Sequence, residues 1–180
     1  VVKQIKILKN HSYFLAQMVK GFFIFLINKL AFQINFPFVG VDQVIKALEG
    51  RIVTEFWGIE ANPTIETLRK AIALGKEKQI DFLLAVGGGS VLDGTKLISS
   101  GLLYDGDAWD LVKKGYYPES VPMGTVLTLP ATGSEMNSGA VISRIETHEK
   151  YPFYSNYPVF SILDPKVTFT LPDFQIACGI

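Results

Sequence analysis

Cysteine is scarce in this 180-residue sequence, and acidic side chains are missing from its first 41 residues. The one cysteine, Cys178, cannot form an internal disulfide, so the chain is typical of a reducing compartment and we expect the cytoplasm. Residues 1–41 carry five lysines and no aspartate or glutamate. The rest of the chain carries 12 basic and 17 acidic residues, a net charge of −5, which gives no basic face for nucleic acid.

A membrane-spanning segment is also missing. The most apolar run is Gly21–Ile27, and Asn28 and Lys29 interrupt it well before the roughly 20 apolar residues that a spanning helix needs. No small-residue cleavage site follows, as a signal peptide would require. A helix lying on a membrane surface is the weaker alternative. We favour the interpretation that residues 1–38 are an atypical segment, frame-shifted or otherwise unrelated to the fold that follows.

From residue 39 onward the sequence alternates between strand-like and helix-like segments. Its length suits one well-packed domain, and 48% hydrophobic with 19% charged residues is a globular composition. Such alternation is typical of an α/β fold with a parallel sheet. We expect Asp105 to Pro118 to be a surface excursion. Helices are predicted for Asp42–Leu48, for a segment capped by Asn62 with Pro63 in its first turn, and for Ser90 to Ser100; strands are predicted for Arg51–Phe56, Phe82–Val86, Val121–Leu129 and Pro158–Leu163.

The turn Gly87–Gly89 lies between the apolar strand Phe82–Val86 and the helix that begins at Ser90. The first turn of a helix presents unpaired N–H groups, and glycine allows a phosphate to approach the backbone closely. Ligands of open α/β sheets bind at the carboxyl ends of the strands, where this turn falls. The turn therefore predicts a phosphate site, although a tight strand-to-helix turn without a ligand would look the same.

Two further groups of polar residues accompany this turn. Ser90, Asp93 and Lys96 are spaced by three and share one face of the helix, where they could orient a ribose; a solvated ion pair is the favoured alternative. The loop Thr128–Glu135 follows a predicted strand and offers hydroxyl and backbone donors to a ribose or phosphate. Ordinary turn chemistry, with Ser134 as a helix cap, would explain that loop equally well.

The two segments resemble a known family. Ala85–Lys96 is similar to the glycine-rich signature of the iron-containing (group III) alcohol dehydrogenases, and Thr128–Asn137 to that family's second signature. The residues of the two segments are most similar to those of the butanol dehydrogenase and broad-range aldehyde reductase branch. The resemblance runs from about Val41 to Ile180. It implies a Rossmann-like parallel sheet with helices on both faces, as in the N-terminal domain of dehydroquinate synthase. A hairpin is expected around Val141 to Leu163.

The resemblance also implies a site for NAD or NADP. In the family the glycine turn holds the pyrophosphate, an aspartate lies near the nicotinamide, hydroxyl side chains line the adenosine and ribose side, and a lysine contacts the ribose. Carried onto this sequence, these positions are Gly88, Gly89 and Ser90 for the pyrophosphate, Asp93 for the nicotinamide end, Thr128, Thr132 and Ser134 for the adenosine side, Lys150 for the ribose, and Asn62 as a further contact.

Catalysis in the family needs a divalent metal, Fe²⁺ or Zn²⁺, held by one Asp and three His from a following helical domain. Neither His11 nor His148 can supply that set, so residues 39–180 are predicted to be a nicotinamide-dinucleotide-binding domain without the all-α metal-binding domain. The implied activity is hydride transfer between nicotinamide and a small alcohol or aldehyde, in a homodimer, with this chain inactive alone. The alternatives are a non-catalytic nucleotide-binding remnant and an interaction module that docks through the apolar N-terminus.

Overall fold

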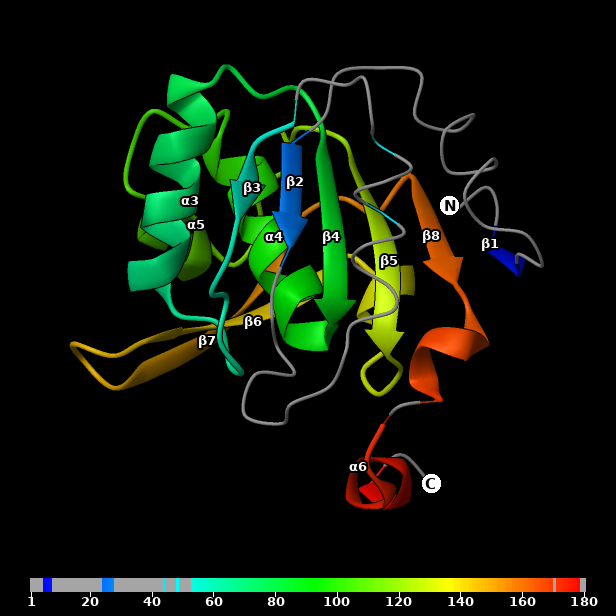
Figure 1. Cartoon of the computed structure of the whole chain (residues 1–180). Coiled ribbons are helices and arrows are strands. Elements are labelled where there is room, and N and C mark those ends of the chain that lie inside the picture. Colours follow the sequence, from blue (N-terminus) through cyan, green and yellow to red (C-terminus); the bar gives the residue numbers. More distant parts are fainter. Residues whose placement is uncertain are drawn as a thin grey trace.

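A six-stranded parallel sheet forms the centre of the molecule (Figure 1). The computed structural model describes residues 5–7, 24–27, 44, 48, 53–169 and 171–178. The strand order is β1-β8-β5-β4-β2-β3. The strands of this sheet are β1 (Ile5–Ile7), β2 (Ile24–Ile27), β3 (Glu55–Phe56), β4 (Leu83–Gly88), β5 (Met123–Leu129) and β8 (Phe160–Leu163). The other elements are α3 (Ile65–Glu77), α4 (Gly89–Gly101), α5 (Ala108–Lys114), η1 (Ser134–Met136), β6 (Gly139–Arg144), β7 (Glu149–Tyr154), η2 (Pro165–Thr168) and α6 (Asp173–Cys178).

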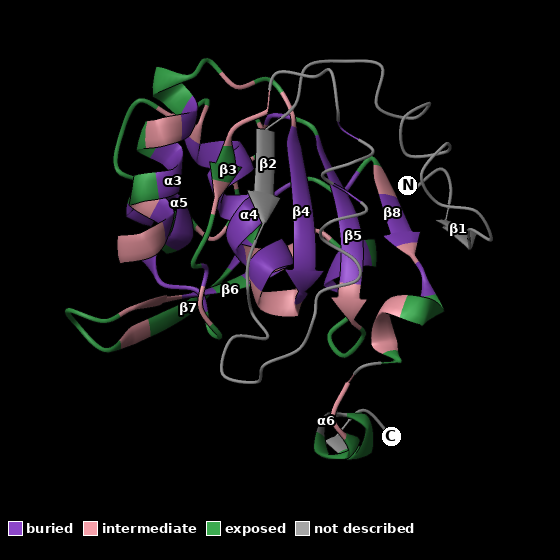
Figure 2. Ribbon diagram, in the orientation of Figure 1, coloured by how far each residue is buried: buried purple, intermediate pink, exposed green. Residues whose placement is uncertain are grey.

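Strand β4 is a buried strand near the middle of the sheet. All six of its residues are buried, as Figure 2 shows, which fits a strand covered on both faces. It pairs with β2 on one side and β5 on the other. On one face, Leu83 and Ala85 share a core cluster with apolar side chains of α3, α4 and α5. The predicted α/β parallel sheet is therefore confirmed, and its carboxyl edge places the end of β4 beside the end of β5.

The segment predicted to be a surface excursion contains a helix of the core. Helix α5 buries Trp109, Leu111 and Val112 in the same cluster as α3 and α4. Asp107 caps it by accepting a hydrogen bond from Trp109 N (2.8 Å), and Gly115 ends it in the left-handed region at φ +79°. The excursion predicted for residues 105–118 was wrong because a seven-residue helix is too short to display a clear apolar period.

Helix α3 begins later than Asn62 and Pro63 predict. Its N-cap is Thr64, and Asn62 lies two residues upstream in the left-handed region at φ +57°. The Glu60 carboxylate accepts hydrogen bonds from Thr64 N (3.2 Å) and from the Thr64 hydroxyl, so it supplies the acceptor that a capping Asn62 would have provided. The prediction of Asn62 as the cap was wrong, and its side chain is left to make other contacts.

The expected hairpin is shorter than the range predicted for it. Strands β6 and β7 pair antiparallel, from Gly139 with Tyr154 to Arg144 with Glu149. The chain then returns to the main sheet, where β8 lies parallel to β5. The hairpin crosses over α4, and Thr64 just before α3 bridges to Ser143 of β6. Strand β6 of the hairpin is thereby brought next to the start of α3 (Figure 1).

Two short pieces of the N-terminal segment lie in the sheet. Ile24–Ile27, part of the apolar run, pairs between β3 and β4, and Ile5–Ile7 pairs with β8 at the edge. Most of residues 1–38, and the helix predicted for Asp42–Leu48 apart from Val44 and Leu48, lie outside the described residues. The domain boundary at 38/39 stays a prediction, and the main sheet includes residues on its N-terminal side.

The burial of α5 leads to a first prediction. Replacing Leu111, which is fully buried, by alanine should lower the free energy of unfolding by about 2–5 kcal/mol, because it opens a cavity in the core. The control is Lys114→Ala on the same helix, which is exposed and whose ammonium contacts the Tyr104 side chain, and it should cost no more than about 1 kcal/mol. Urea unfolding measures both; equal effects of the two variants would show that α5 does not belong to the core.

Candidate functional site

The candidate site begins where β4 passes into α4. Gly88 ends the strand and is the N-cap of the helix, and no side chain caps the first turn. That turn contains no acidic residue. Its backbone N–H groups therefore lack an intrahelical or capping partner, and the positive end of the helix dipole is not neutralised locally. A helix start of this kind suits a phosphate group.

Two of the three glycines of the turn, Gly87 and Gly89, are also required by the protein's own packing. A Cβ on Gly87 would lie closer than 3.0 Å to Val91, and one on Gly89 closer than 3.0 Å to the Thr132 side chain. At Gly88 the nearest atom would be Leu129 Cβ, at 3.3 Å. The triplet lets the turn lie directly against helix α4 and against the loop after β5. Close packing and close approach of a ligand are thus two separate reasons for glycine here.

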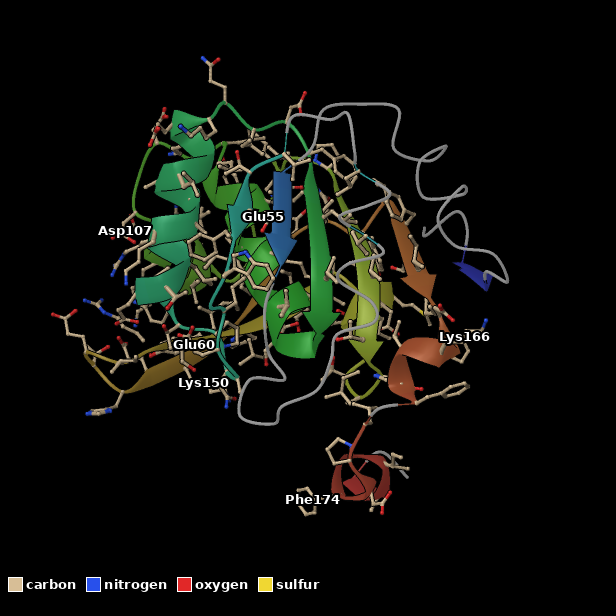
Figure 3. The ribbon with its side chains drawn as sticks, viewed as in Figure 1. Glu55, Glu60, Asp107, Lys150, Lys166 and Phe174 are labelled. Atoms are coloured by element: carbon tan, nitrogen blue, oxygen red, sulfur yellow. The ribbon has the colours of Figure 1, made fainter. Side chains whose placement is uncertain are left out.

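Asn62, Ser90 and Lys150 meet beside this turn although they come from distant parts of the sequence. Lys150 Nζ donates to Asn62 Oδ1 (2.8 Å), and Asn62 N donates to Ser90 Oγ (3.3 Å). Lys150 comes from hairpin strand β7, and Figure 3 shows it next to Glu60, where the hairpin meets the segment before α3. All three residues were predicted from the sequence as cofactor contacts, and the structure brings them together.

The second group of predicted residues forms a buried network around Lys96. Lys96 Nζ donates to Ser134 Oγ (2.8 Å), and Ser134 Oγ donates to Asp93 Oδ1 (2.6 Å). Lys96 is fully buried, so the favoured alternative of a solvated ion pair with Asp93 was wrong. Ser134 belongs to η1, whose N-cap is Gly133, so it is not a helix cap. No pattern in the sequence marks Lys96 as buried, because its neighbours one helical turn away include Asp93, Ser99 and Ser100.

Burial changes the acidity of this lysine. Loss of solvation lowers the pKa of Lys96 to about 8, while the negative charges of Asp93 and Glu135 partly oppose that shift. Glu135 is itself buried, and its Oε2 has no hydrogen-bond partner among the described residues. The network therefore places one ammonium between two carboxylates in a region shielded from water.

The hydroxyl residues of the second signature lie on the other side of the turn. Thr132 is exposed, packs against Gly89, and its Oγ1 accepts from Ser134 N (3.3 Å). Thr128 lies at the end of β5, where the pairing with β4 shifts register between Gly87 and Gly88. The shift leaves Thr128 opposite the glycine turn. Thr128 and Thr132 thus flank the turn, while the Ser134 hydroxyl is already engaged within the protein.

Sequence reasoning missed two residues that shape the site. Glu60 accepts from Thr64 N and from Thr67 Oγ1 (3.2 Å each), which holds the segment that carries Asn62. Asn137 accepts from Lys96 and donates from Nδ2 to Gly133 O (2.9 Å), which closes the loop. Asn137 lies inside the second signature, so its place in that motif could have marked it as a site residue. Nothing in the sequence around Glu60 marks it.

The described residues offer no metal centre. Within them, no group of three or more His, Cys, Asp or Glu side chains is placed to hold a metal ion. His148 is exposed at the tip of the hairpin, and His11 lies outside the described residues. Among the helices of the described part, none is both long enough and apolar enough to cross a membrane.

The sheet is parallel, and a glycine turn with an uncapped helix start and flanking polar side chains lies at the carboxyl end of a central strand. This is the place at which open α/β domains bind their ligands. The model of the family "Iron-containing alcohol dehydrogenase" matches residues 33–165. The chain belongs to the iron-containing alcohol dehydrogenase family, as its two signature segments predicted.

Individual relatives identify the branch. The sequence is 58% identical over 144 residues to a probable NADH-dependent butanol dehydrogenase 1 of Bacillus subtilis, covering 77% of this chain and 37% of the relative. It is 53% identical over 146 residues to the NADPH-dependent aldehyde reductase YqhD of Escherichia coli, covering 78% and 38%. The structure of NADH-dependent butanol dehydrogenase A from Thermotoga maritima superposes with a TM-score of 0.88 at 35% identity, over 99% of this chain and 46% of that one.

These matches confirm the predicted branch and fold. The chain spans 37% to 38% of the length of the two curated relatives, and it matches the N-terminal portion of the family fold.

The packing of the glycine turn leads to a second prediction, tested by a double-mutant cycle on Gly89→Ala and Thr132→Ala. The added methyl would lie closer than 3.0 Å to Oγ1 and Cγ2 of Thr132, whereas alanine at that position would leave only its Cβ, at 3.2 Å. Gly89→Ala should therefore cost about 1 kcal/mol more in the presence of Thr132 than in the Thr132→Ala background. Unfolding is measured without nucleotide. A coupling free energy of zero would mean that Gly89 is not needed for packing.

Proposed function

We propose that this chain supplies the NAD(P)-binding part of a metal-dependent alcohol dehydrogenase or aldehyde reductase. The observation that carries the proposal is the meeting of Asn62, Ser90 and Lys150 at the uncapped start of α4. Three polar side chains from separate elements converge beside a turn whose glycines keep the backbone accessible. The relatives named for NADH and for NADPH support a nicotinamide dinucleotide as the ligand.

The residues at the turn fit the chemical groups of such a cofactor. The N–H groups of Gly89 and Ser90 would bind the pyrophosphate, since they begin α4 without a capping side chain. Lys150 and Asn62 would bind a ribose, because an ammonium and an amide can donate to its hydroxyls. Thr128 and Thr132 would line the adenosine side. When bound, the nicotinamide supplies the group that gives or accepts a hydride.

Asp93 and Ser134 have a different place in this proposal. Their hydrogen bond, and the bond from Val141 N to Asp93 Oδ2 (3.0 Å), orient the loop after β5 relative to α4. Both oxygens of Asp93 thus already accept protein hydrogen bonds. Asp93 would act near the nicotinamide end chiefly by holding this arrangement. The described residues do not contain a metal-ligand set, so we assign no metal-dependent step to them.

A third prediction concerns cofactor binding. The chain should bind NADH or NADPH, and Lys150→Met should weaken the preferred nucleotide about tenfold, which is the loss expected for a charge-assisted hydrogen bond. The control, Lys70→Met, removes an exposed lysine of α3 that contacts none of the predicted site residues. Nucleotide fluorescence or calorimetry measures the Kd. Failure of the unmodified chain to bind either nucleotide would refute the proposed function.

A fourth prediction concerns turnover. The 180-residue chain alone should not oxidise NADH or NADPH with a short aliphatic aldehyde, with or without added Fe²⁺ or Zn²⁺. A catalytic metal needs converging ligands of the right number and geometry, and the described residues do not provide them. Absorbance of the reduced nicotinamide measures the rate. Metal-dependent turnover that survives purification to homogeneity would contradict the prediction and would locate a complete active centre within this chain.

A further inference from the structure

Lys96 is a fully buried ammonium that contacts none of the groups assigned to the nucleotide. It donates to Ser134 Oγ (2.8 Å), Asn137 Oδ1 (3.0 Å) and Gly139 O (2.6 Å). These acceptors all belong to the chain after β5, 38 to 43 residues further along. An ammonium has three donors, and all of them are used. Lys96 therefore joins α4 to the segment that carries the second signature.

The acceptors are themselves held in a fixed arrangement. Asn137 donates from Nδ2 to Gly133 O (2.9 Å) and accepts from Gly139 N (2.9 Å), which closes the loop on both sides. The Ser134 hydroxyl donates a hydrogen bond to Asp93 Oδ1, so its oxygen lone pairs are free to accept from Lys96. A carboxylate and an ammonium on one helix thus hold the same loop. The loop they hold carries Thr132, which lies against Gly89 of the phosphate turn.

We propose that Lys96 is a positioning residue for dinucleotide binding, holding the Thr132–Ser134 loop against the glycine turn so that both sides of the cofactor site keep one geometry. The proposal rests on the proposed function. Desolvation makes a buried charge costly, and an apolar side chain of similar length would fill the same space without that cost. The three directed hydrogen bonds are what an apolar side chain cannot reproduce.

The protonation state of Lys96 gives the proposal a pH signature. The charged groups that face it are Asp93 on its own helix and Glu135 on η1, while β6 contributes the neutral Gly139 carbonyl. Burial lowers the pKa of Lys96 to about 8. Above that pH the neutral amine has two hydrogens for three acceptors, so one contact to the loop is lost. Nucleotide affinity should therefore fall as the pH rises from 7 to 9.5.

Folding stability should respond to this group in the opposite direction. The pKa of Lys96 in the folded chain lies below its ordinary value of 10.5, so the unfolded chain binds the proton more tightly. The contribution of Lys96 to stability is then least favourable below pH 8 and improves between pH 8 and 10.5. A loss of affinity in this range would not be a loss of folding. The pH profile of nucleotide affinity and the pH profile of folding stability therefore distinguish a positioning role of Lys96 from a purely structural one.

The experiment compares the unmodified chain with Lys96→Met and with Thr95→Val. Thr95 is the matched control, because it is buried on the same helix and bonds only to Val91 O within that helix (2.7 Å). Amide hydrogen exchange is followed for residues 132–139, and the Kd for NADH and NADPH is measured from pH 7 to 9.5. Lys96→Met should speed exchange in this segment, weaken the preferred nucleotide about tenfold, and abolish the fall in affinity with pH. Thr95→Val should keep all three properties of the unmodified chain.

Unchanged exchange and unchanged affinity in Lys96→Met would overturn the proposal, as would equal effects in both variants. If Lys96→Met does not fold, the pH profile of the unmodified chain decides: a fall in affinity above pH 8 supports the proposal, and a flat profile overturns it. If the unmodified chain binds neither nucleotide, the proposed function fails. In that case hydrogen exchange in residues 132–139 still tests whether charged Lys96 holds the loop. After correction for intrinsic rates, exchange in the unmodified chain should be slower at pH 7 than at pH 9.5, and Lys96→Met should show no such difference.

Discussion

The hydrogen bonds between Lys96, Ser134 and Asp93 connect the two signature segments of this chain, and the geometry of the candidate site depends on them. One segment follows β4 and provides an open helix start, and the other follows β5 and provides hydroxyl side chains. Neighbouring parallel strands place the two segments at the same edge of the sheet, but pairing alone does not set the position of a loop. Buried, directed hydrogen bonds do set it, because leaving any partner unsatisfied would be costly.

A second constraint is the close contact between backbone segments at the glycine turn. Gly87 lies against Val91 and Gly89 against Thr132, so any side chain there would displace either the helix or the loop. The absence of Cβ atoms that would suit a phosphate therefore also serves the protein's own packing. A glycine motif of this kind reports on packing and on ligand binding together, and only stability measured without ligand can separate the two.

The polar side of the site is assembled by the β6–β7 hairpin. Lys150 comes from this hairpin and Asn62 from the segment before α3, 88 residues away in sequence. Glu60 holds the Asn62 segment by accepting from Thr64 N and Thr67 Oγ1, and the bridge between Thr64 and Ser143 keeps the hairpin beside it. A change in the hairpin would therefore alter the site without touching the glycine turn. A hairpin outside the main sheet thus contributes a lysine to the candidate site.

Short-range patterns in the sequence were enough to predict the buried strand before the triplet, the helix after it, the parallel α/β sheet and the family. An apolar run, a glycine turn and a helical period are local features, so neighbouring residues determine them. Three features were decided by tertiary contacts instead. Helix α5 entered the core, Asn62 took a left-handed conformation in place of a capping one, and Lys96 became buried. Asn62 and Lys96 depend on partners 28 or more residues away in the sequence. Helix α5 is buried because it packs against α3, α4 and β7, and only the folded chain brings these elements together.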